Sequence, residues 1–288
     1  MVMETVVTIS DVRRSVETFR RASKRVAFVP TMGALHDGHL SLVEIARSRC
    51  DYCVMSIFVN PTQFNSAADL EKYPRMLDQD EQKARSVGVD LVFAPAVDEM
   101  YGASGEATKE LCSVRAGSRS YILEGAYRPG HFDGVVTVVA KLFNIVQPDI
   151  AVFGEKDFQQ VQVIKQMVDD LAMPVEIVIG PTVREVDGLA LSSRNLRLSA
   201  EQRFRALFIP RALEKARELV EKGERNVQYL KEMVRENLER SQALRVDYVD
   251  IVDPGTFTLL SSISGPAQML IAAHVDDIRL IDNMRLDG

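Results

Sequence analysis

Residues 26–40 read V-A-F-V-P-T-M-G-A-L-H-D-G-H-L. The first five form an apolar run of the kind found in buried β-strands, and from Leu40 the apolar residues recur with helical spacing. Between them lies a turn that contains two glycines and two histidines. A strand, a tight turn and a helix in this order are typical of one βα unit of a parallel sheet.

Apolar runs and helical patterns continue to alternate as far as Pro181. Runs rich in β-branched residues, separated by helices, are what a parallel sheet covered on both faces requires. We therefore predict an α/β fold in which ligands bind beyond the carboxyl ends of the strands. The expected strands span 26–30, 54–59, 89–93, 150–153 and 175–179, and the expected helices span 40–49, 70–87, 132–146 and 158–172.

The remainder of the chain has a different pattern. A polar loop over 184–197 precedes two long charged helical patterns, and Ser199 with Gln202 has the spacing of a capping box for the first of them. Strand-like runs separated by Gly, Pro and Ser end the chain. We expect a larger α/β domain over 1–182 and a smaller α+β domain over 183–288. In the smaller domain the expected helices span 200–221 and 227–240, and the expected strands span 246–252, 269–273 and 278–281.

Composition limits the partners and the compartment. The 288 residues carry a formal charge of −6 and the basic residues are dispersed, so no basic surplus exists to neutralise nucleic-acid phosphates. The first residues lack the features of a signal peptide and no apolar run is long enough to cross a bilayer, so we expect a cytoplasmic protein without membrane contact. Cys50 and Cys53 form a C-x-x-C, which leaves open a redox pair or half a zinc site. We favour buried small hydrophobic residues for the cysteines, including Cys112, and a packed or capped role for His274.

The turn over 33–39 has the features of a phosphate-binding site. Gly33 and Gly38 allow backbone amides to approach a ligand, and a helix that begins near Gly38 directs its N–H groups at the same place. His36 and His39 are three residues apart, so both face one side of a helical turn. Two imidazoles can donate hydrogen bonds to the phosphates as pyrophosphate leaves. The alternative is an ordinary strand–turn–helix corner with two solvated histidines.

Three other polar segments follow expected strands or join the two halves. The N-P-T-Q-F segment over 60–64 offers neutral amides that suit hydroxyl and carboxylate groups, although alone it also fits an unspecialised loop. The G-E-K-D segment over 154–157 combines a glycine for close approach with a lysine point charge for phosphate. The L-S-S-R-N segment over 191–195 suits a clamp on a triphosphate, and its composition also fits a solvated linker.

These motifs resemble those of a known superfamily. H-x-G-H after the first strand is similar to the signature of adenylyl-transferring enzymes, which include nucleotidyltransferases and class I aminoacyl-tRNA synthetases. The longer string P-T-M-G-A-L-H-D-G-H-L over 30–40 resembles one family among them, the pantothenate synthetases. The segments over 58–64, 127–132, 154–157 and 192–195 agree with this narrower match. The resemblance implies a Rossmann-like ATP- and pantoate-binding domain over 1–182, with 183–288 forming a lid over the site.

The resemblance also implies which residues serve each substrate. His39, His36, Lys156 and Arg194 stabilise the charge that develops during the reaction, with His39 as the acid if one is assigned. Pantoate and β-alanine contact Gln63, Gln160, Asn60, Arg128 and His131, although structural roles for Arg128 and His131 fit the sequence equally well. ATP contacts Met32, Gly33, Ala34, Leu35, His36, Asp37, Gly38, His39, Gly154, Glu155, Lys156, Asp157, Val183, Leu191, Ser192, Ser193 and Arg194.

The implied reaction has two steps and requires no nucleophilic side chain. The pantoate carboxylate attacks the α-phosphorus of Mg-ATP to give pantoyl adenylate and pyrophosphate, and the amine of β-alanine then displaces AMP. Mg²⁺ arrives with ATP and not on a protein-borne site. Asp78 and Asp80 are candidates for helping to hold it, although solvated helix-surface acids are the simpler interpretation. A homodimer is a further implication, and the alternative function is nucleotidyl transfer to a phosphorylated acceptor.

Overall fold

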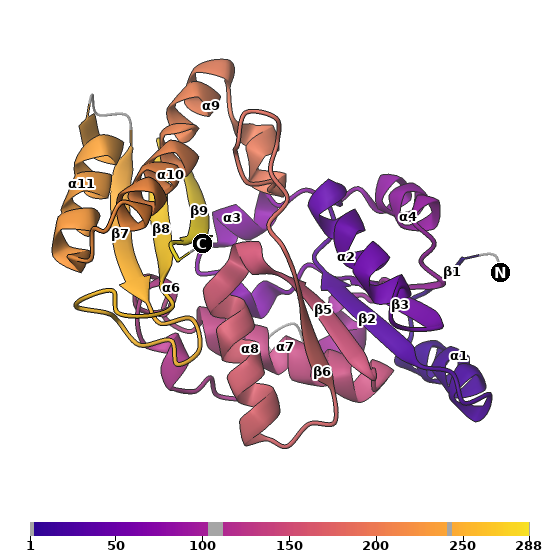
Figure 1. The fold of residues 1–288 in the computed structure, drawn as a ribbon. Coiled ribbons are helices and arrows are strands. Elements are labelled where there is room, and N and C mark those ends of the chain that lie inside the picture. Colours follow the sequence, from indigo (N-terminus) through magenta and orange to yellow (C-terminus); the bar gives the residue numbers. More distant parts are fainter. Residues whose placement is uncertain (1–2, 103–111, 241–243, 288) are drawn as a thin grey trace. The chain divides into compact units, whose positions relative to one another are not determined.

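The computed structural model describes residues 3–102, 112–240 and 244–287. These residues divide into two compact units (Figure 1). Unit 1 consists of Met1–Glu155 and Gln160–Pro181, and unit 2 consists of Lys156–Gln159 and Thr182–Gly288. Among the described residues, no helix combines the length and the apolar character needed to span a bilayer.

Unit 1 is built around a six-stranded sheet in which all paired strands are parallel. The strand order is β1-β4-β3-β2-β5-β6. The predicted α/β fold with a Rossmann-like parallel sheet is therefore confirmed, and β1 is a strand that the sequence analysis did not predict. The strands are β1 (Glu4–Val6), β2 (Val26–Thr31), β3 (Tyr52–Ile57), β4 (Leu91–Phe93), β5 (Ile150–Gly154) and β6 (Glu176–Gly180).

The helices of this part of the chain are α1 (Ile9–Arg21), α2 (Asp37–Arg47), α3 (Ala67–Glu71), α4 (Leu77–Ser86), α5 (Val97–Tyr101), α6 (Glu124–Tyr127), α7 (His131–Val146) and α8 (Phe158–Asp170). In Figure 1, α2 and α4 lie on one face of the sheet and α1 and α7 on the other. On β2, Val26 and Phe28 belong to the core under α1 and α7, whereas Ala27 and Val29 belong to the core under α2. Alternate side chains of a strand point to opposite faces, so burial of both sets explains the continuous apolar run.

Two parts of unit 1 differ from the prediction. The single helix expected over 70–87 is wrong, because α3 and α4 occupy this region as separate helices. Pro74 lies between them, lacks an N–H and disfavours a helical conformation in the residue before it. The sequence analysis also missed α1, although Thr8 provides an N-cap signal by accepting from the N–H of Asp11 at 3.2 Å.

The sheet order places β2 at a topological switch point. From β2 the chain adds β3 and then β4 on one side, and it later adds β5 and β6 on the other side. In open α/β sheets the crevice at such a point, beyond the carboxyl ends of the strands, binds ligands. The residues that follow β2 and β5, 32–39 and 155, therefore leave the sheet where its topology favours a ligand.

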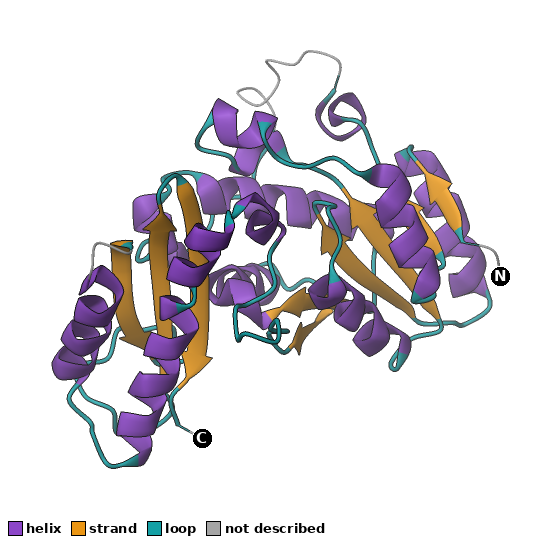
Figure 2. Ribbon diagram, turned by 90° about the horizontal axis from the view of Figure 1, so that it is seen from above, coloured by secondary structure: helices purple, strands orange, loops and turns teal. Residues whose placement is uncertain are grey.

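Unit 2 contains an antiparallel sheet of β7 (Arg245–Val252), β8 (Gln268–Val275) and β9 (Ile278–Arg285). Helices α10 (Phe208–Glu221) and α11 (Val227–Glu239) run beside it, and their apolar residues share one core with the strands (Figure 2). The predicted smaller α+β fold is confirmed. The helix expected over 200–221 is divided at Leu207 into α9 (Ala200–Ala206) and α10, and Pro210 lies in the first turn of α10, where a missing N–H is tolerated. The predicted capping box of Ser199 and Gln202 is present.

The three cysteines form no disulfide. Cys53 lies buried in β3, and burial raises the pKa of its thiol to about 12. Burial also raises the pKa of Cys50, which is half-buried. Because redox and metal chemistry use the thiolate, these pKa shifts favour the interpretation as small hydrophobic residues. That interpretation is wrong for Cys112, which is exposed.

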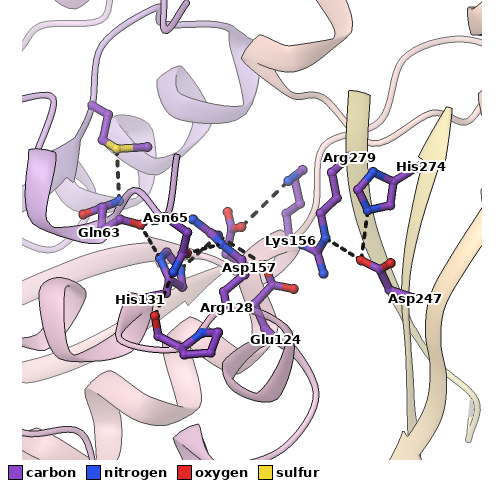
Figure 3. A network of polar contacts seen from close by, with 12 residues as sticks. Gln63, Asn65, Glu124, Arg128, His131, Lys156, Asp157, Asp247, His274 and Arg279 are labelled. Atoms are coloured by element: carbon purple, nitrogen blue, oxygen red, sulfur yellow. Dashed lines mark hydrogen bonds and ion pairs between the residues drawn. The ribbon is translucent and has the colours of Figure 1, made fainter. Parts of the chain in front are cut away.

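A buried carboxylate joins the strands of unit 2. The ladder between β7 and β8 shifts register between Val246 and Tyr248, which makes Asp247 a bulge residue. Its Oδ2 accepts from Nε of Arg279 at 2.8 Å and lies 3.1 Å from Nε2 of His274 (Figure 3). Burial lowers the pKa of His274, and the Asp247 carboxylate offsets this effect in part. The predicted packed, hydrogen-bonded role of His274 is confirmed.

We expect His274→Gln to flatten the pH dependence of the free energy of unfolding. Asp247, Arg245 and Arg279 surround the ring, and the net result is a folded pKa below the ordinary value of 6.5. The unfolded chain therefore binds this proton more readily, so the stabilisation is present above pH 6.5 and is lost as the pH falls through the folded pKa. Urea unfolding of the wild type and the variant on both sides of this window measures the two slopes. Identical slopes would contradict the assignment.

Candidate active site

The turn between β2 and α2 is held by hydrogen bonds within unit 1. The N–H of Gly33 donates to Oγ1 of Thr31 at 3.2 Å, and the N–H groups of Ala34 and Leu35 donate to the carboxylate of Asp80 at 2.9 and 2.7 Å. Gly33 and Ala34 have φ values of 80° and 51°, so two consecutive residues adopt left-handed conformations. These three amides bind groups of the protein itself, which corrects the expectation that amides around Gly33 point at a ligand. Contact of Ala34 or Leu35 with ATP stays a prediction for their other atoms.

His36 and His39 face each other at the start of α2. His36 is the N-cap residue, and the two ring centroids lie 4.0 Å apart, in keeping with their three-residue spacing. The backbone N–H of His36 donates to Nδ1 of His39 at 3.3 Å. Since this nitrogen accepts, the proton of a neutral His39 ring is on Nε2. His39 thus presents an N–H donor on the opposite edge of its ring.

Helix α2 supplies further donors beside the histidines. The N–H groups in the first turn of a helix have no intrahelical acceptor, and together with the helix dipole they favour an anion. The helix is fixed on the sheet by Leu42, Val43 and Ala46, which are buried. A Cβ on Gly180 would lie 2.3 Å from Cδ2 of Leu42, so this glycine allows α2 to pack closely on β6. Asp37 and Gly38, for which ATP contacts are predicted, are the first two residues of the helix.

Gln63 lies next to the histidine turn. It ends the 3₁₀ turn η1 (Pro61–Gln63), which follows β3, and its Nε2 donates to Sδ of Met32 at 3.1 Å. Its Oε1 accepts from Nδ2 of Asn60 at 3.0 Å, which orients the amide. The NH₂ group of Gln63 therefore faces Met32, where it can donate to a carboxylate or hydroxyl oxygen. Figure 3 shows this amide close to His131.

Asn60 is 1% exposed and is bound within unit 1. Its Oδ1 accepts from the hydroxyls of Tyr101 at 2.8 Å and Thr62 at 3.0 Å, and its Nδ2 also donates to the carbonyl of Gly134 at 3.2 Å. Burial raises the pKa of Tyr101, which keeps its hydroxyl protonated as a donor. In this arrangement Asn60 orients Gln63, and its direct contact with a substrate stays a prediction. Tyr101 has no sequence signal, because it lies 41 residues from Asn60 and outside any motif.

Arg128 and His131 converge on the backbone of Gln63. Nη2 of Arg128 and Nδ1 of His131 lie 3.1 and 2.8 Å from the carbonyl oxygen of Gln63 (Figure 3). Nη1 of Arg128 lies 3.2 Å from Nε2 of His131. Because an arginine N–H only donates, Nε2 of His131 accepts and its Nδ1–H donates to the carbonyl. Both residues therefore hold the Gln63 turn, which is the structural alternative left open by the sequence. Their contact with a substrate stays a prediction.

The lysine of the G-E-K-D segment lies in unit 2. As predicted, β5 leads into a turn, η4 (Glu155–Asp157), and then into α8. Nζ of Lys156 lies 3.8 Å from Oδ1 of Asp157, and the carbonyl of Lys156 accepts from Nδ2 of Asn283 at 2.9 Å. Asn283 is buried in β9 and its Oδ1 accepts from Gln268 at 2.7 Å, so the last strand fixes the backbone of Lys156. No sequence motif pointed to Asn283.

The S-S-R-N segment is a folded part of unit 2. Ser192 begins the 3₁₀ turn η5 (Ser193–Arg197), and its hydroxyl accepts from the N–H of Arg194 at 3.3 Å. Asn195 donates to Oε1 of Glu185 at 2.9 Å and to the carbonyl of Ala190 at 3.0 Å. Leu191 donates to the carbonyl of Val183 at 3.0 Å. These bonds exclude the alternative of an unstructured linker for this segment.

The predicted site residues thus fall into two groups. In unit 1, the histidine turn and the Gln63 cluster are joined through Met32. Gly154 ends β5, Glu155 follows it, and Gln160 lies half-buried on the first turn of α8, all in unit 1. The residues of unit 2 are Lys156, Asp157, Val183, Leu191, Ser192, Ser193 and Arg194.

Fold and site together define a class of protein. It is a doubly wound α/β protein with a histidine-bearing helix N-terminus, a phosphate-binding feature, at the switch point of its sheet and with buried amide donors beside it. The sequence profile of the pantoate-beta-alanine ligase family matches residues 4–285. The chain belongs to this ligase family, as the motifs predict.

Individual relatives agree over the full length. The chain is 49% identical over 285 residues to pantothenate synthetase 1 of Bradyrhizobium diazoefficiens, which covers 99% of this chain and 98% of the relative. The crystal structure of pantothenate synthetase from Thermus thermophilus superposes with a TM-score of 0.91 at 45% identity, covering 99% of this chain and 100% of that one. Pantoate-beta-alanine ligase from Francisella tularensis, complexed with β-γ ATP and β-alanine, gives 0.80 at 33% identity, covering 99% and 98%.

Gly134 allows α7 to approach the Gln63 turn, and we expect Gly134→Ala to be destabilising. A Cβ at this position would lie 2.5 Å from the carbonyl oxygen of Thr62 and 2.9 Å from Cα of Gln63. Backbone atoms cannot yield as a flexible side chain can, so overpacking should lower the free energy of unfolding by about 1–3 kcal/mol. Denaturant titration provides the measurement. Gly265→Ala is the matched control, because its added Cβ meets no atom within 4 Å; equal stability of the two variants would show that the approach is not tight.

Proposed function

We propose that the chain joins (R)-pantoate to β-alanine in an ATP-dependent reaction that passes through pantoyl adenylate and releases AMP and pyrophosphate. One observation of the structure carries this proposal. The contact between Gln63 and Met32 joins an amide donor suited to a hydroxy acid to a histidine turn suited to phosphate. Membership of the ligase family and the β-γ ATP and β-alanine bound to the Francisella relative support the same substrates.

In the proposed first step, a carboxylate oxygen of pantoate attacks the α-phosphorus of Mg-ATP, and the bond to the pyrophosphate oxygen breaks. Negative charge then increases on the phosphate oxygens. The Nε2–H of His39 and the N-terminus of α2 stabilise this charge as preorganised donors, without a proton transfer. We assign His36, Lys156 and Arg194 to the same phosphates. The other predicted ATP contacts belong to this proposal, including Val183 beside the adenine.

In the proposed second step, the amine of β-alanine attacks the activated carbonyl carbon. The carbon–oxygen bond to AMP breaks, so AMP leaves with an oxygen that came from pantoate. The NH₂ group of Gln63 holds a pantoate oxygen, with Asn60, Arg128 and His131 keeping the Gln63 turn in place. Gln160 is the second proposed pantoate contact. Positioning and charge stabilisation account for both steps, and no covalent enzyme intermediate is required.

Four further features stay predictions of the family resemblance. Mg²⁺ enters with ATP as part of the substrate. The protein forms a homodimer and acts in the cytoplasm. Residues 183–288 close over the nucleotide during the reaction, which would shield the mixed anhydride from water.

Oxygen transfer tests the proposed function against its rival. With pantoate labelled by ¹⁸O in its carboxylate, we expect one labelled oxygen in each AMP, since the bridging oxygen stays with phosphorus. Mass spectrometry of the AMP measures it, and a parallel reaction in labelled water should leave AMP unlabelled. The alternative function, nucleotidyl transfer, would retain the nucleotide on the product. Unlabelled AMP, ADP as the product, or no dependence on pantoate would contradict adenylate formation.

The role of His39 predicts an order of activity among its variants. We expect His39→Ala to lower the rate of pantoate-dependent ATP–pyrophosphate exchange by about 10²–10³-fold, as for loss of one preorganised donor. His39→Gln, which can place an amide N–H near the Nε2 position, should retain more activity than the alanine variant. Circular dichroism and thermal melts confirm that the variants fold. Equal activity of the two variants would show that a donor at Nε2 is not what matters.

A further inference from the structure

Asp80 on α4 is 1% exposed. A carboxylate is costly to bury unless hydrogen bonds replace its water. Here each oxygen accepts one backbone N–H, Oδ2 from Ala34 and Oδ1 from Leu35. The interpretation of Asp80 as a solvated helix-surface acid is therefore wrong. Two donors already engage the two oxygens, which also leaves the carboxylate poorly suited to a metal ion.

A second side chain of α4 holds the same turn. Nζ of Lys83 donates to the carbonyl of Leu35 at 2.6 Å. Asp80 and Lys83 are three residues apart, so they lie on one side of the helix. Together they bind the N–H and the carbonyl of Leu35, which directly precedes His36. α4 therefore fixes the orientation of the peptide groups on both sides of Leu35.

The turn needs such a partner. Ala34 has φ 51°, a left-handed conformation that is unfavourable for a residue with a Cβ and persists where the surroundings enforce it. Beyond Leu35, the N–H of His36 donates to Nδ1 of His39. A continuous path of contacts thus leads from the Asp80 carboxylate through Leu35 and His36 to the ring of His39.

We infer that Asp80 is a positioning residue, which holds the histidine turn in the conformation that keeps the Nε2–H tautomer of His39, and that it does not act as a ligand of Mg²⁺. The inference rests on the proposed function for its effect on activity. It requires a carboxylate specifically. An asparagine offers one acceptor oxygen for the two amides, and its NH₂ group would oppose one of the two N–H donors.

Asp80→Asn tests this, with Glu81→Gln as the control for the same chemical change one residue along α4. We expect pantoate-dependent ATP–pyrophosphate exchange to fall by about a hundredfold in Asp80→Asn, as for a misplaced catalytic group, and to be unchanged in Glu81→Gln. The Mg²⁺ concentration that gives half-maximal activity should not shift. Exchange at the wild-type rate, or activity restored by raising Mg²⁺, would overturn the inference.

The tautomer of His39 gives a second measurement that needs no substrate. ¹⁵N–¹H correlation spectra of the histidine rings, assigned with His39→Gln, should show one Nε2–H tautomer in the wild type and a mixture in Asp80→Asn. An unchanged tautomer in the variant would overturn the inference even where activity falls. If Asp80→Asn does not fold, Lys83→Met removes the bond to the Leu35 carbonyl and should lower exchange by about tenfold; a wild-type rate there would count against the inference. A wild type without exchange would instead refute the proposed function.

Discussion

The structure of unit 1 depends on the burial of β2 on both of its faces. Val26 and Phe28 on one side and Ala27 and Val29 on the other all have 0% exposure. A strand in this position must lie in the interior of the sheet, with parallel neighbours on each side. Its carboxyl end then opens at the switch point, and the residues that follow it have no choice but to form the wall of the crevice.

Internal hydrogen bonds decide which groups of that wall can serve a ligand. The amides of residues 33–36 bind Thr31, Asp80 and His39, so their directions are set before any substrate arrives. What the turn offers outward is the edge of an imidazole and the first turn of a helix. Preorganised donors of this kind lose little energy to reorientation during the reaction, which is why they stabilise developing charge effectively.

The same logic governs the amides around Gln63. Asn60 binds its side chain, while Arg128 and His131 bind its backbone carbonyl. Three residues that a motif would assign to the substrate thus support one residue that faces the nucleotide turn. Unit 2 treats Lys156 similarly, since Asn283 holds its carbonyl. Asn60 and Asn283 are neutral, so they fix Gln63 and Lys156 without burying an unpaired charge.

The sequence by itself determined the α/β fold, the α+β fold of the smaller part, the family and the residues of the histidine turn. It could do so because hydrophobic periodicity and short motifs are local along the chain. The breaks at Pro74 and Leu207 were missed, although Pro74 gave a local signal. The roles of Asp80, Tyr101 and Asn283 were decided by tertiary structure alone. Each depends on hydrogen bonds across tens of residues or more, and a side chain's partner at such a distance follows from packing and leaves no pattern in the sequence.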